Sequence, residues 1–162
     1  LIQPRIEAEI AFLLARPLRG PGVTREDVLA ASAAVLPSFE VIDSRIADWR
    51  IGLVDTVADV ASSARFVLGP DRVAPDTLDL ASIEVAVTRN GAPVASGPGP
   101  AVLGDPAIAV AWAANTLGAL GETLEAGHVI LPGAVHASVP AVAGDAFVAT
   151  FSGLGSVRAT FA

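Results

Sequence analysis

The segment from Pro4 to Leu14 alternates apolar and charged residues with the two-residue period of a β-strand. Glu7 and Glu9 would point to one face of this strand, whereas the apolar Ile6 and Ala8 would point to the other. A strand with one apolar face must bury that face against a second layer of structure. We therefore expect a sheet that packs against another element and carries two carboxylates on its opposite face.

A helix is expected after this strand. Thr24, followed three residues later by Asp27, matches the capping box that begins many helices. The helix would run to about Ala34, because Pro37 interrupts the segment. A short buried strand is expected over 38–42.

A second helix and a series of short strands are expected in the rest of the chain. Asp105 can serve as the N-cap of a helix over 106–120, with Pro106 at its first position. Asn90-Gly91 is the dipeptide most typical of a tight β-hairpin. Strands are expected over 65–68, 83–89, 93–96, 128–131, 146–151 and 156–161. These elements predict an α+β fold, a mixed β-roll or sandwich with two main helices, in one domain over 1–162.

The composition excludes several classes of site. The 162 residues include no cysteine, no lysine and no tyrosine, so disulfides, thiol nucleophiles and lysine Schiff bases are impossible. The formal net charge of −7 argues against nucleic acid and anionic membrane surfaces as partners. No stretch is apolar enough to span a bilayer, and no signal-like segment opens the chain, so we expect a cytoplasmic protein.

Three glutamates form the strongest candidate site. Glu7 and Glu9 share one face of their strand, and Glu40 stands between two apolar residues in another expected strand. Three carboxylates from two strands would form an oxygen-rich half-shell that suits Mg²⁺ or Mn²⁺. The alternative is a solvated strand face, which is the commoner explanation of an isolated pair of glutamates.

Polar residues also cluster at 43–45 and at 55–63. Arg45 could pair with Asp43 or Asp48, or it could bind a substrate carboxylate through two hydrogen bonds. The alternative is that these clusters form turns and caps. His128 and His136 flank the strand expected at 128–131, and we expect structural roles for both.

Six stretches together resemble one known family: 4–12 (PRIEAEIAF), 39–46 (FEVIDSRI), 55–63 (DTVADVASS), 101–106 (AVLGDP), 111–115 (AWAAN) and 153–157 (GLGSV). They resemble the 2-oxopent-4-enoate hydratases, a family that also contains the 4-oxalocrotonate decarboxylases and belongs to the fumarylacetoacetate hydrolase superfamily. The resemblance implies the superfamily's β-roll and places a divalent metal on Glu7, Glu9 and Glu40. This placement agrees with the interpretation from the residues themselves.

The resemblance implies a hydratase that adds water to 2-hydroxypenta-2,4-dienoate, giving 4-hydroxy-2-oxopentanoate in the meta-cleavage degradation of aromatic compounds. A 4-oxalocrotonate decarboxylase is the alternative, and a non-catalytic family member is a further one. The resemblance, together with proximity in sequence, makes Asp43, Arg45, Ser62 and Ser63 the candidate catalytic residues, which would line the far end of the substrate. The implied partners are a small 2-oxo or 2-hydroxydienoic acid and further subunits, as a homo-oligomer or a hydratase–decarboxylase complex.

The sequence departs from the family pattern in three places. The family's additional N-terminal region, which lines the active site, is not part of this sequence. Val60 stands where the family usually has asparagine, and Pro132 stands where it has serine or threonine before Gly133. We expect these departures to affect activity and the orientation of the substrate.

Overall fold

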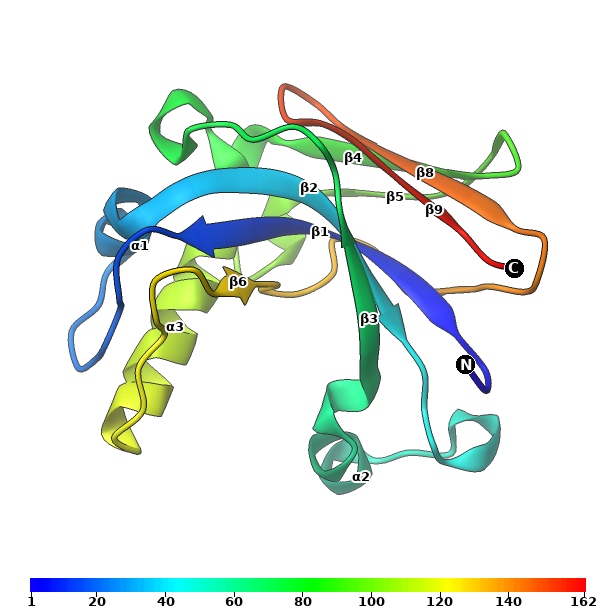
Figure 1. The fold of residues 1–162 in the computed structure, drawn as a ribbon, viewed down its shortest axis with the longest axis horizontal. Helices are drawn as coiled ribbons and strands as arrows, with labels where there is room; N and C mark the ends of the chain where they lie inside the picture. Colours follow the sequence, from blue (N-terminus) through cyan, green and yellow to red (C-terminus); the bar gives the residue numbers. More distant parts are fainter.

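Two antiparallel sheets pack face to face in the computed structural model, which describes residues 1–162 (Figure 1). The first sheet has the strand order β3 (Ser63–Leu68), β2 (Ser32–Ile42), β1 (Arg5–Leu14) and β6 (Val129–Ile130). A further short strand, β7 (Val139–Pro140), also pairs with β1. The second sheet has the order β5 (Ala92–Pro98), β4 (Glu84–Arg89), β8 (Ala146–Phe151) and β9 (Gly155–Thr160).

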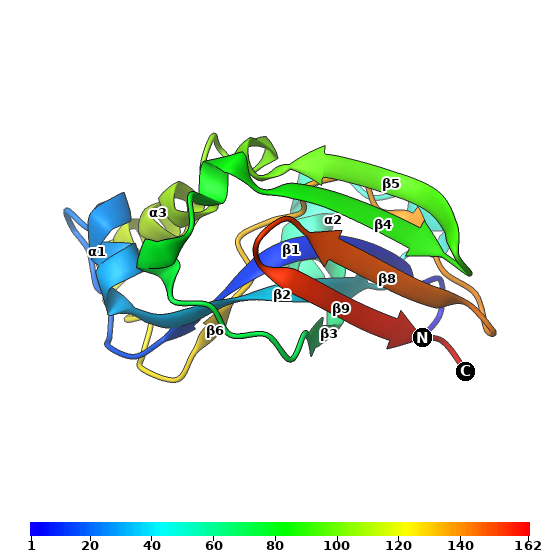
Figure 2. The same ribbon diagram turned by 90° about the horizontal axis from the view of Figure 1, so that it is seen from above.

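Three α-helices accompany the sheets: α1 (Arg25–Ala31), α2 (Leu53–Ala58) and α3 (Pro106–Ala119). Seen from above, α1 and α3 lie together at one end of the molecule, and the second sheet extends toward the other end (Figure 2). Short 3₁₀ turns occupy Ala47–Trp49, Val60–Ser62, Pro75–Thr77, Leu80–Ser82 and Gly99–Ala101. None of the helices has the length and hydropathy needed to cross a membrane. The arrangement confirms the predicted α+β fold with two main helices, α1 and α3.

The main core lies between the two sheets and under the helices. On β1, Ile6, Ala8, Ile10 and Phe12 are fully buried and belong to this core. The neighbouring strand β2 contributes Val35, Phe39 and Val41 to the same cluster. The facing second sheet contributes Val85, Val87, Phe147, Ala149, Phe151 and Val157. The apolar alternation of β1 therefore serves the purpose that its sequence predicts.

The local signals for turns and helix starts are confirmed. Thr24 accepts a hydrogen bond from the Asp27 N–H, and the Asp27 carboxylate accepts one from the Thr24 N–H, which completes the capping box of α1. Asp105 caps α3 by accepting from the N–H of Ala107. Asn90 and Gly91 both have positive φ angles between β4 and β5, as a tight hairpin turn requires.

The prediction for residues 32–42 is partly wrong. The first helix ends at Ala31 rather than Ala34, and β2 begins at Ser32 and continues through Pro37. A proline is tolerated there because β3 ends at Leu68, one residue before the position opposite Pro37. Gly69 still donates its N–H to the Pro37 carbonyl at 2.7 Å, so the sheet lacks only the hydrogen bond that Pro37, without an N–H, cannot donate.

Candidate metal centre

The register between β1 and β2 brings three carboxylates together. Glu7 lies opposite Glu40 across the antiparallel pair, and Glu9 lies opposite Ser38, so all three glutamates are on one face of the sheet. One carboxylate oxygen from each lies within 4.8 Å of the others. The predicted clustering of Glu7, Glu9 and Glu40 is thus what the strand pairing produces.

This face of the sheet is not a solvated surface. The side chain of Glu9 is only 1% exposed, and the neighbouring Ala11, Ala34 and Leu36 are buried on the same face outside the main core. The Oε2 atom of Glu9 accepts the backbone N–H of Gly133 at 2.8 Å. A buried acidic side chain with a dedicated donor is the opposite of the solvated alternative.

The electrostatics of the cluster favour protons or a cation. Burial raises the pKa of Glu9 to about 8; the N–H of Gly133 opposes this shift, and the charges of Glu40 and Glu7 add to it. Burial and the charge of Glu40 raise the pKa of Glu7 to about 7, with Arg5 acting in the opposite direction. At neutral pH this site holds excess negative charge only at a free-energy cost.

A divalent cation fits these residues. Carboxylate oxygens are the ligands that Mg²⁺ and Mn²⁺ prefer, and three of them from two strands leave coordination positions open on one side. A cation would also relieve the repulsion that raises the pKa values of Glu7 and Glu9. The donor chemistry, the separation and the burial therefore agree with one another.

The predicted catalytic residue Asp43 lies just beyond the end of β2, and its carboxylate holds the start of the chain. Its two oxygens accept the backbone N–H groups of Ile2 and Gln3 at 2.6 and 2.7 Å. Its own N–H donates to the carbonyl of Ser62. Asp43 thus links the first residues, the end of β2 and the segment that returns to β3.

Arg45 and Ser62 meet in one small network. The guanidinium of Arg45 pairs with Asp59 at 3.2 Å, and the Ser62 hydroxyl donates to Asp59 Oδ2 at 3.4 Å. The expectation that Arg45 pairs with Asp43 or Asp48 is wrong, because the chain folds back after α2 and brings Asp59 alongside it.

The remaining predicted residues are Ser63 and the two histidines. Ser63 is the first residue of β3 and pairs with Ile42, which follows Glu40 by two residues on β2. His136 Nε2 accepts the N–H of Ala8, and His128 Nδ1 accepts that of Glu125, as their expected structural roles predict.

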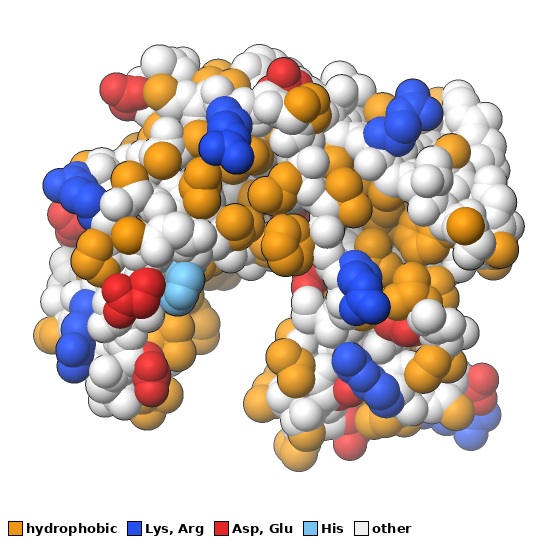
Figure 3. Space-filling view, viewed as in Figure 1, with side chains coloured by type: hydrophobic (Ala, Val, Ile, Leu, Met, Phe, Trp, Pro, Cys, Tyr) orange, Lys and Arg blue, Asp and Glu red, His pale blue; other side chains and the backbone are white.

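A hollow lies beneath the strands that carry the glutamates. In the space-filling view the molecule is hollowed between two projections, one containing α3 and the other α2 (Figure 3). In the same view β1 and β2 run across the top of this hollow (Figure 1). The predicted residues at 43–63 belong to the projection that contains α2.

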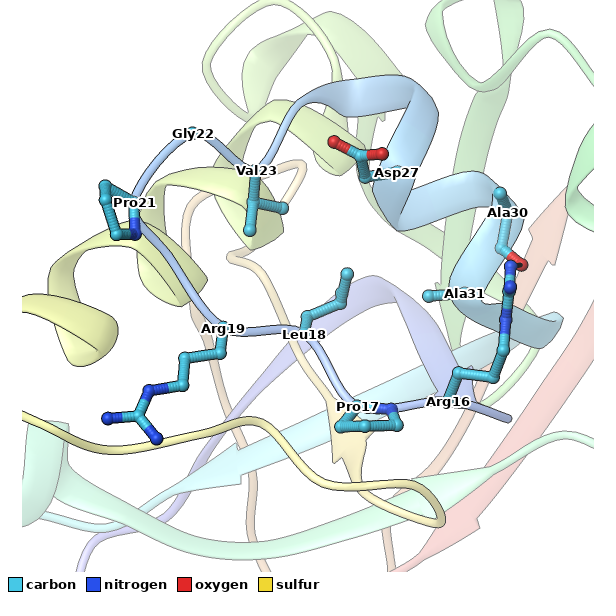
Figure 4. Close-up of a pocket in the computed structure, with 10 residues that line it drawn as sticks. All are labelled: Arg16, Pro17, Leu18, Arg19, Pro21, Gly22, Val23, Asp27, Ala30 and Ala31. Atoms are coloured by element: carbon cyan, nitrogen blue, oxygen red, sulfur yellow. Dashed lines mark hydrogen bonds between the residues drawn. The ribbon is translucent and has the colours of Figure 1, made fainter.

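A separate cavity of about 550 Å³ lies between α1 and the loop at 16–23 (Figure 4). Leu18 and Val23 point into it, whereas the guanidinium of Arg19 points away. Arg16 donates instead to the carbonyl of Ala30. None of the three glutamates lines this cavity, so it is not part of the candidate metal centre.

The roles of two residues at the site were not predicted from the sequence. Gly133 supplies a backbone N–H from a loop, and Asp59 supplies the partner of Arg45. A backbone donor carries no side-chain signal, although Gly133 has a φ of +133° that favours glycine.

Comparison with known proteins gives consistent matches. The model of the family described as "Fumarylacetoacetate (FAA) hydrolase C-terminal" matches residues 2–162. A 2-hydroxyhexa-2,4-dienoate hydratase from Comamonas testosteroni is 55% identical over 161 residues, which are 99% of this chain and 61% of that protein. A 2-keto-4-pentenoate hydratase from Paraburkholderia xenovorans is 47% identical over 99% of this chain and 60% of its own length.

Solved structures agree with the sequence matches. The 4-oxalocrotonate decarboxylase from Pseudomonas putida G7, complexed with magnesium and adipate, superposes with a TM-score of 0.95 at 43% identity. The match covers all of this chain and 62% of the decarboxylase. The chain therefore spans about three fifths of the length of the relatives it matches.

Proposed function

The chain belongs to the fumarylacetoacetate hydrolase C-terminal family, and from this premise we propose that it is a metal-dependent hydratase. The proposed substrate is 2-hydroxypenta-2,4-dienoate or a close homologue, and the product is the corresponding 4-hydroxy-2-oxo acid. Two relatives support this choice: one named 2-hydroxyhexa-2,4-dienoate hydratase, at 55% identity, and one named 2-keto-4-pentenoate hydratase, at 47% identity.

The clustering of Glu7, Glu9 and Glu40 is the observation that carries the proposal. We propose that these three side chains hold Mg²⁺ or Mn²⁺, and the magnesium complex of the decarboxylase supports a divalent ion. When bound, the ion would supply the positive charge that draws electrons toward the C2 oxygen of the substrate.

The protein's own groups have separate tasks. The N–H of Gly133 holds one carboxylate oxygen of Glu9 and favours its ionised form. We propose that Arg45, Ser62 and Ser63 line the end of the substrate that receives water, at C4 for the hydratase. Asp43 supports them by joining the end of β2 to the segment that returns to β3.

Decarboxylation of 4-oxalocrotonate is the second candidate. The structural match to a 4-oxalocrotonate decarboxylase, with a TM-score of 0.95, favours it. Both reactions need electrons to flow toward a C2 oxygen, so the same three carboxylates would serve either. The groups around the far end of the substrate would then decide between adding water and releasing CO₂.

The test is a comparison of both substrates on the purified protein with Mg²⁺ or Mn²⁺. We expect loss of the dienoate absorbance, with 4-hydroxy-2-oxopentanoate identified by NMR, and loss of this activity in Glu9→Gln. Release of CO₂ from 4-oxalocrotonate (2-oxohex-3-enedioate), without hydration of the dienoate, would instead assign the decarboxylase activity. Metal binding with neither activity would contradict the proposal and indicate a non-catalytic member.

We further propose that the protein forms a homo-oligomer. Large apolar side chains are exposed on α2 and beside it, namely Leu53, Val54, Val57 and Val60. Trp112 on α3 is also 65% exposed. Large exposed apolar side chains that cluster on one element, as on α2, are typical of subunit contacts. Light scattering after size-exclusion chromatography should give a mass above that of one chain. If the protein also binds a 4-oxalocrotonate decarboxylase, mixing the two proteins should give a second, heavier species.

A further inference from the structure

A loop covers the outer edge of β1 beside the proposed metal ligands Glu7 and Glu9. Short strands pair with both ends of this edge: β7 with Arg5 and Ile6, and β6 with Phe12 and Leu13. Between them, the backbone of Ala8 meets the loop that joins β6 to β7. The carbonyl of Ala8 accepts the N–H of Val135 at 3.1 Å, and its N–H donates to His136 Nε2 at 3.0 Å.

An imidazole nitrogen thus replaces the carbonyl that a paired strand would offer. Because Nε2 accepts a hydrogen bond, the ring proton of His136 is on Nδ1. Nδ1 lies 2.8 Å from the carbonyl of Ala137, to which it donates. Hydrogen bonds hold both ring nitrogens, so the acceptor Nε2 is aimed at the N–H of Ala8.

Ala8 is the residue between Glu7 and Glu9. The direction of its backbone therefore sets the directions of both flanking side chains. We propose that His136 is a positioning residue for the metal centre, which fixes Ala8 so that both carboxylates reach one ion. This inference rests on the proposed metal site at Glu7, Glu9 and Glu40, and it adds a residue that touches none of the reacting atoms.

The loop reaches the centre at two further points. Gly133 donates to Glu9 Oε2, and Val135 donates to the carbonyl of Ala8. With His136, three residues within four positions of this loop therefore bind Ala8 and Glu9 on β1. Partners that orient metal ligands typically change metal affinity by 10–100-fold when removed. Loss of the His136 acceptor should act in this way, although the three ligands remain.

The other histidine provides a matched control. His128 Nδ1 also accepts a backbone N–H at 3.0 Å, from Glu125, but in the turn before β6 and away from the glutamates on β1. His128→Leu removes the same kind of hydrogen bond without touching Ala8. A general loss of stability would affect both variants, whereas a positioning role belongs to His136 alone.

The experiment measures Mn²⁺ affinity by titration and the bound ion by electron paramagnetic resonance, on the purified protein below the melting temperature of every variant. His136→Leu should weaken Mn²⁺ binding by about tenfold and broaden the spectrum. His136→Gln places an amide oxygen near the position of Nε2, so it should restore affinity to within about threefold. His128→Leu should bind Mn²⁺ like the wild type.

The outcomes separate this inference from the proposed function. No Mn²⁺ binding by the wild type would overturn the metal site and this inference with it. Wild-type affinity in folded His136→Leu, or equal weakening in His128→Leu, would overturn the positioning role alone. If His136→Leu does not fold, His136→Asn replaces it, because its shorter side chain cannot reach Ala8; wild-type affinity in that variant would overturn the inference.

Discussion

Gly133 donates its backbone N–H to Glu9 Oε2 at 2.8 Å, although the two residues are 124 positions apart in the sequence. The bond stabilises the ionised carboxylate, whereas burial and two nearby glutamates destabilise it. The net result is a pKa of about 8, so protons and metal ions compete for this side chain near neutral pH.

Metal affinity should rise with pH. Glu7 and Glu9 must be ionised to bind a cation, and their pKa values in the metal-free protein are about 7 and about 8. We expect the apparent affinity for Mg²⁺ or Mn²⁺ to increase steadily from pH 6 to about pH 8.5. Titration calorimetry in two buffers of different ionisation enthalpy should show proton release on binding. Affinity independent of pH would contradict the raised pKa values.

The metal-free protein should lose stability as the pH rises. The unfolded chain releases the protons of Glu7 and Glu9 near the ordinary pKa of 4.5, and the folded chain releases them near 7 and 8. Folding therefore retains protons in this window, and the free energy of unfolding falls as the pH increases through it. Thermal unfolding from pH 5 to pH 8.5 checks this, and excess Mg²⁺ should remove most of the decline. Asp27 and Asp145, with lowered pKa values, act below this window.

Replacing Glu9 by glutamine should separate binding from stability. Glu9→Gln keeps an oxygen that can accept the N–H of Gly133 but removes the buried charge. We expect metal binding to weaken by more than tenfold, because one of three ligands is lost. The metal-free variant should be more stable than the wild type at pH 8.5, by on the order of 2 kcal/mol. The reason is that position 9 then carries no buried carboxylate that must ionise. Lower stability at that pH would contradict the assignment of burial as the cause of the shift.

Val60→Asn should stabilise the protein. Val60 has a φ of +54°, a region that β-branched residues rarely adopt and that asparagine tolerates. Its side chain is 72% exposed, so little apolar burial is lost. We expect a gain of about 1 kcal/mol, or about 3 °C in the melting temperature. Val57→Asn is the control, since Val57 is 70% exposed but lies in the helix α2. An equal gain there would mean that replacing an exposed apolar side chain by a polar one, and not the relief of backbone strain, causes the stabilisation.

Gly97→Ala should destabilise the fold. A Cβ atom at Gly97 on β5 would lie 1.8 Å from the carbonyl oxygen of Val135, whose N–H binds Ala8. The loop cannot retreat without loosening that bond, and overpacking of this kind costs about 1–3 kcal/mol. Urea denaturation of Gly97→Ala and of Gly52→Ala provides the check. A Cβ at Gly52 would meet only ordinary contacts at 3.6 Å, so only the first variant should lose stability.

Patterns within a few residues of sequence predicted the local structure well. The period-two alternation around Glu7, the capping box at Thr24 and the Asn90-Gly91 turn all operate between neighbours, and the structure confirms each of them. The continuation of β2 through Pro37 could not be predicted in this way. It depends on the neighbouring strand having ended at Leu68, and only the assembled sheet determines that.

The candidate site divides in the same manner. Its acidic side chains are visible in the sequence, because carboxylates in otherwise apolar strands are unusual. Their supporting contacts are not visible, since Gly133 contributes a backbone group and His136 makes a contact 128 positions away. Arg45 shows the same limit: the acidic neighbours at 43 and 48 were the expected partners, whereas the tertiary fold selected Asp59.

The wide spacing of these contacts along the chain also has a consequence for how the site assembles during folding. Glu7 and Glu40 meet when β1 pairs with β2, which closes a loop of about 30 residues, whereas the loop carrying Gly133 and His136 must return over more than 120. The longer closure costs about 1 kcal/mol more in chain entropy. We therefore expect the acidic cluster to form before the distant loop reaches it, and we expect the contacts of that loop with Ala8 and Glu9 to fix the carboxylates in place. A metal ion present during folding would then meet the three carboxylates before the loop has closed beside them.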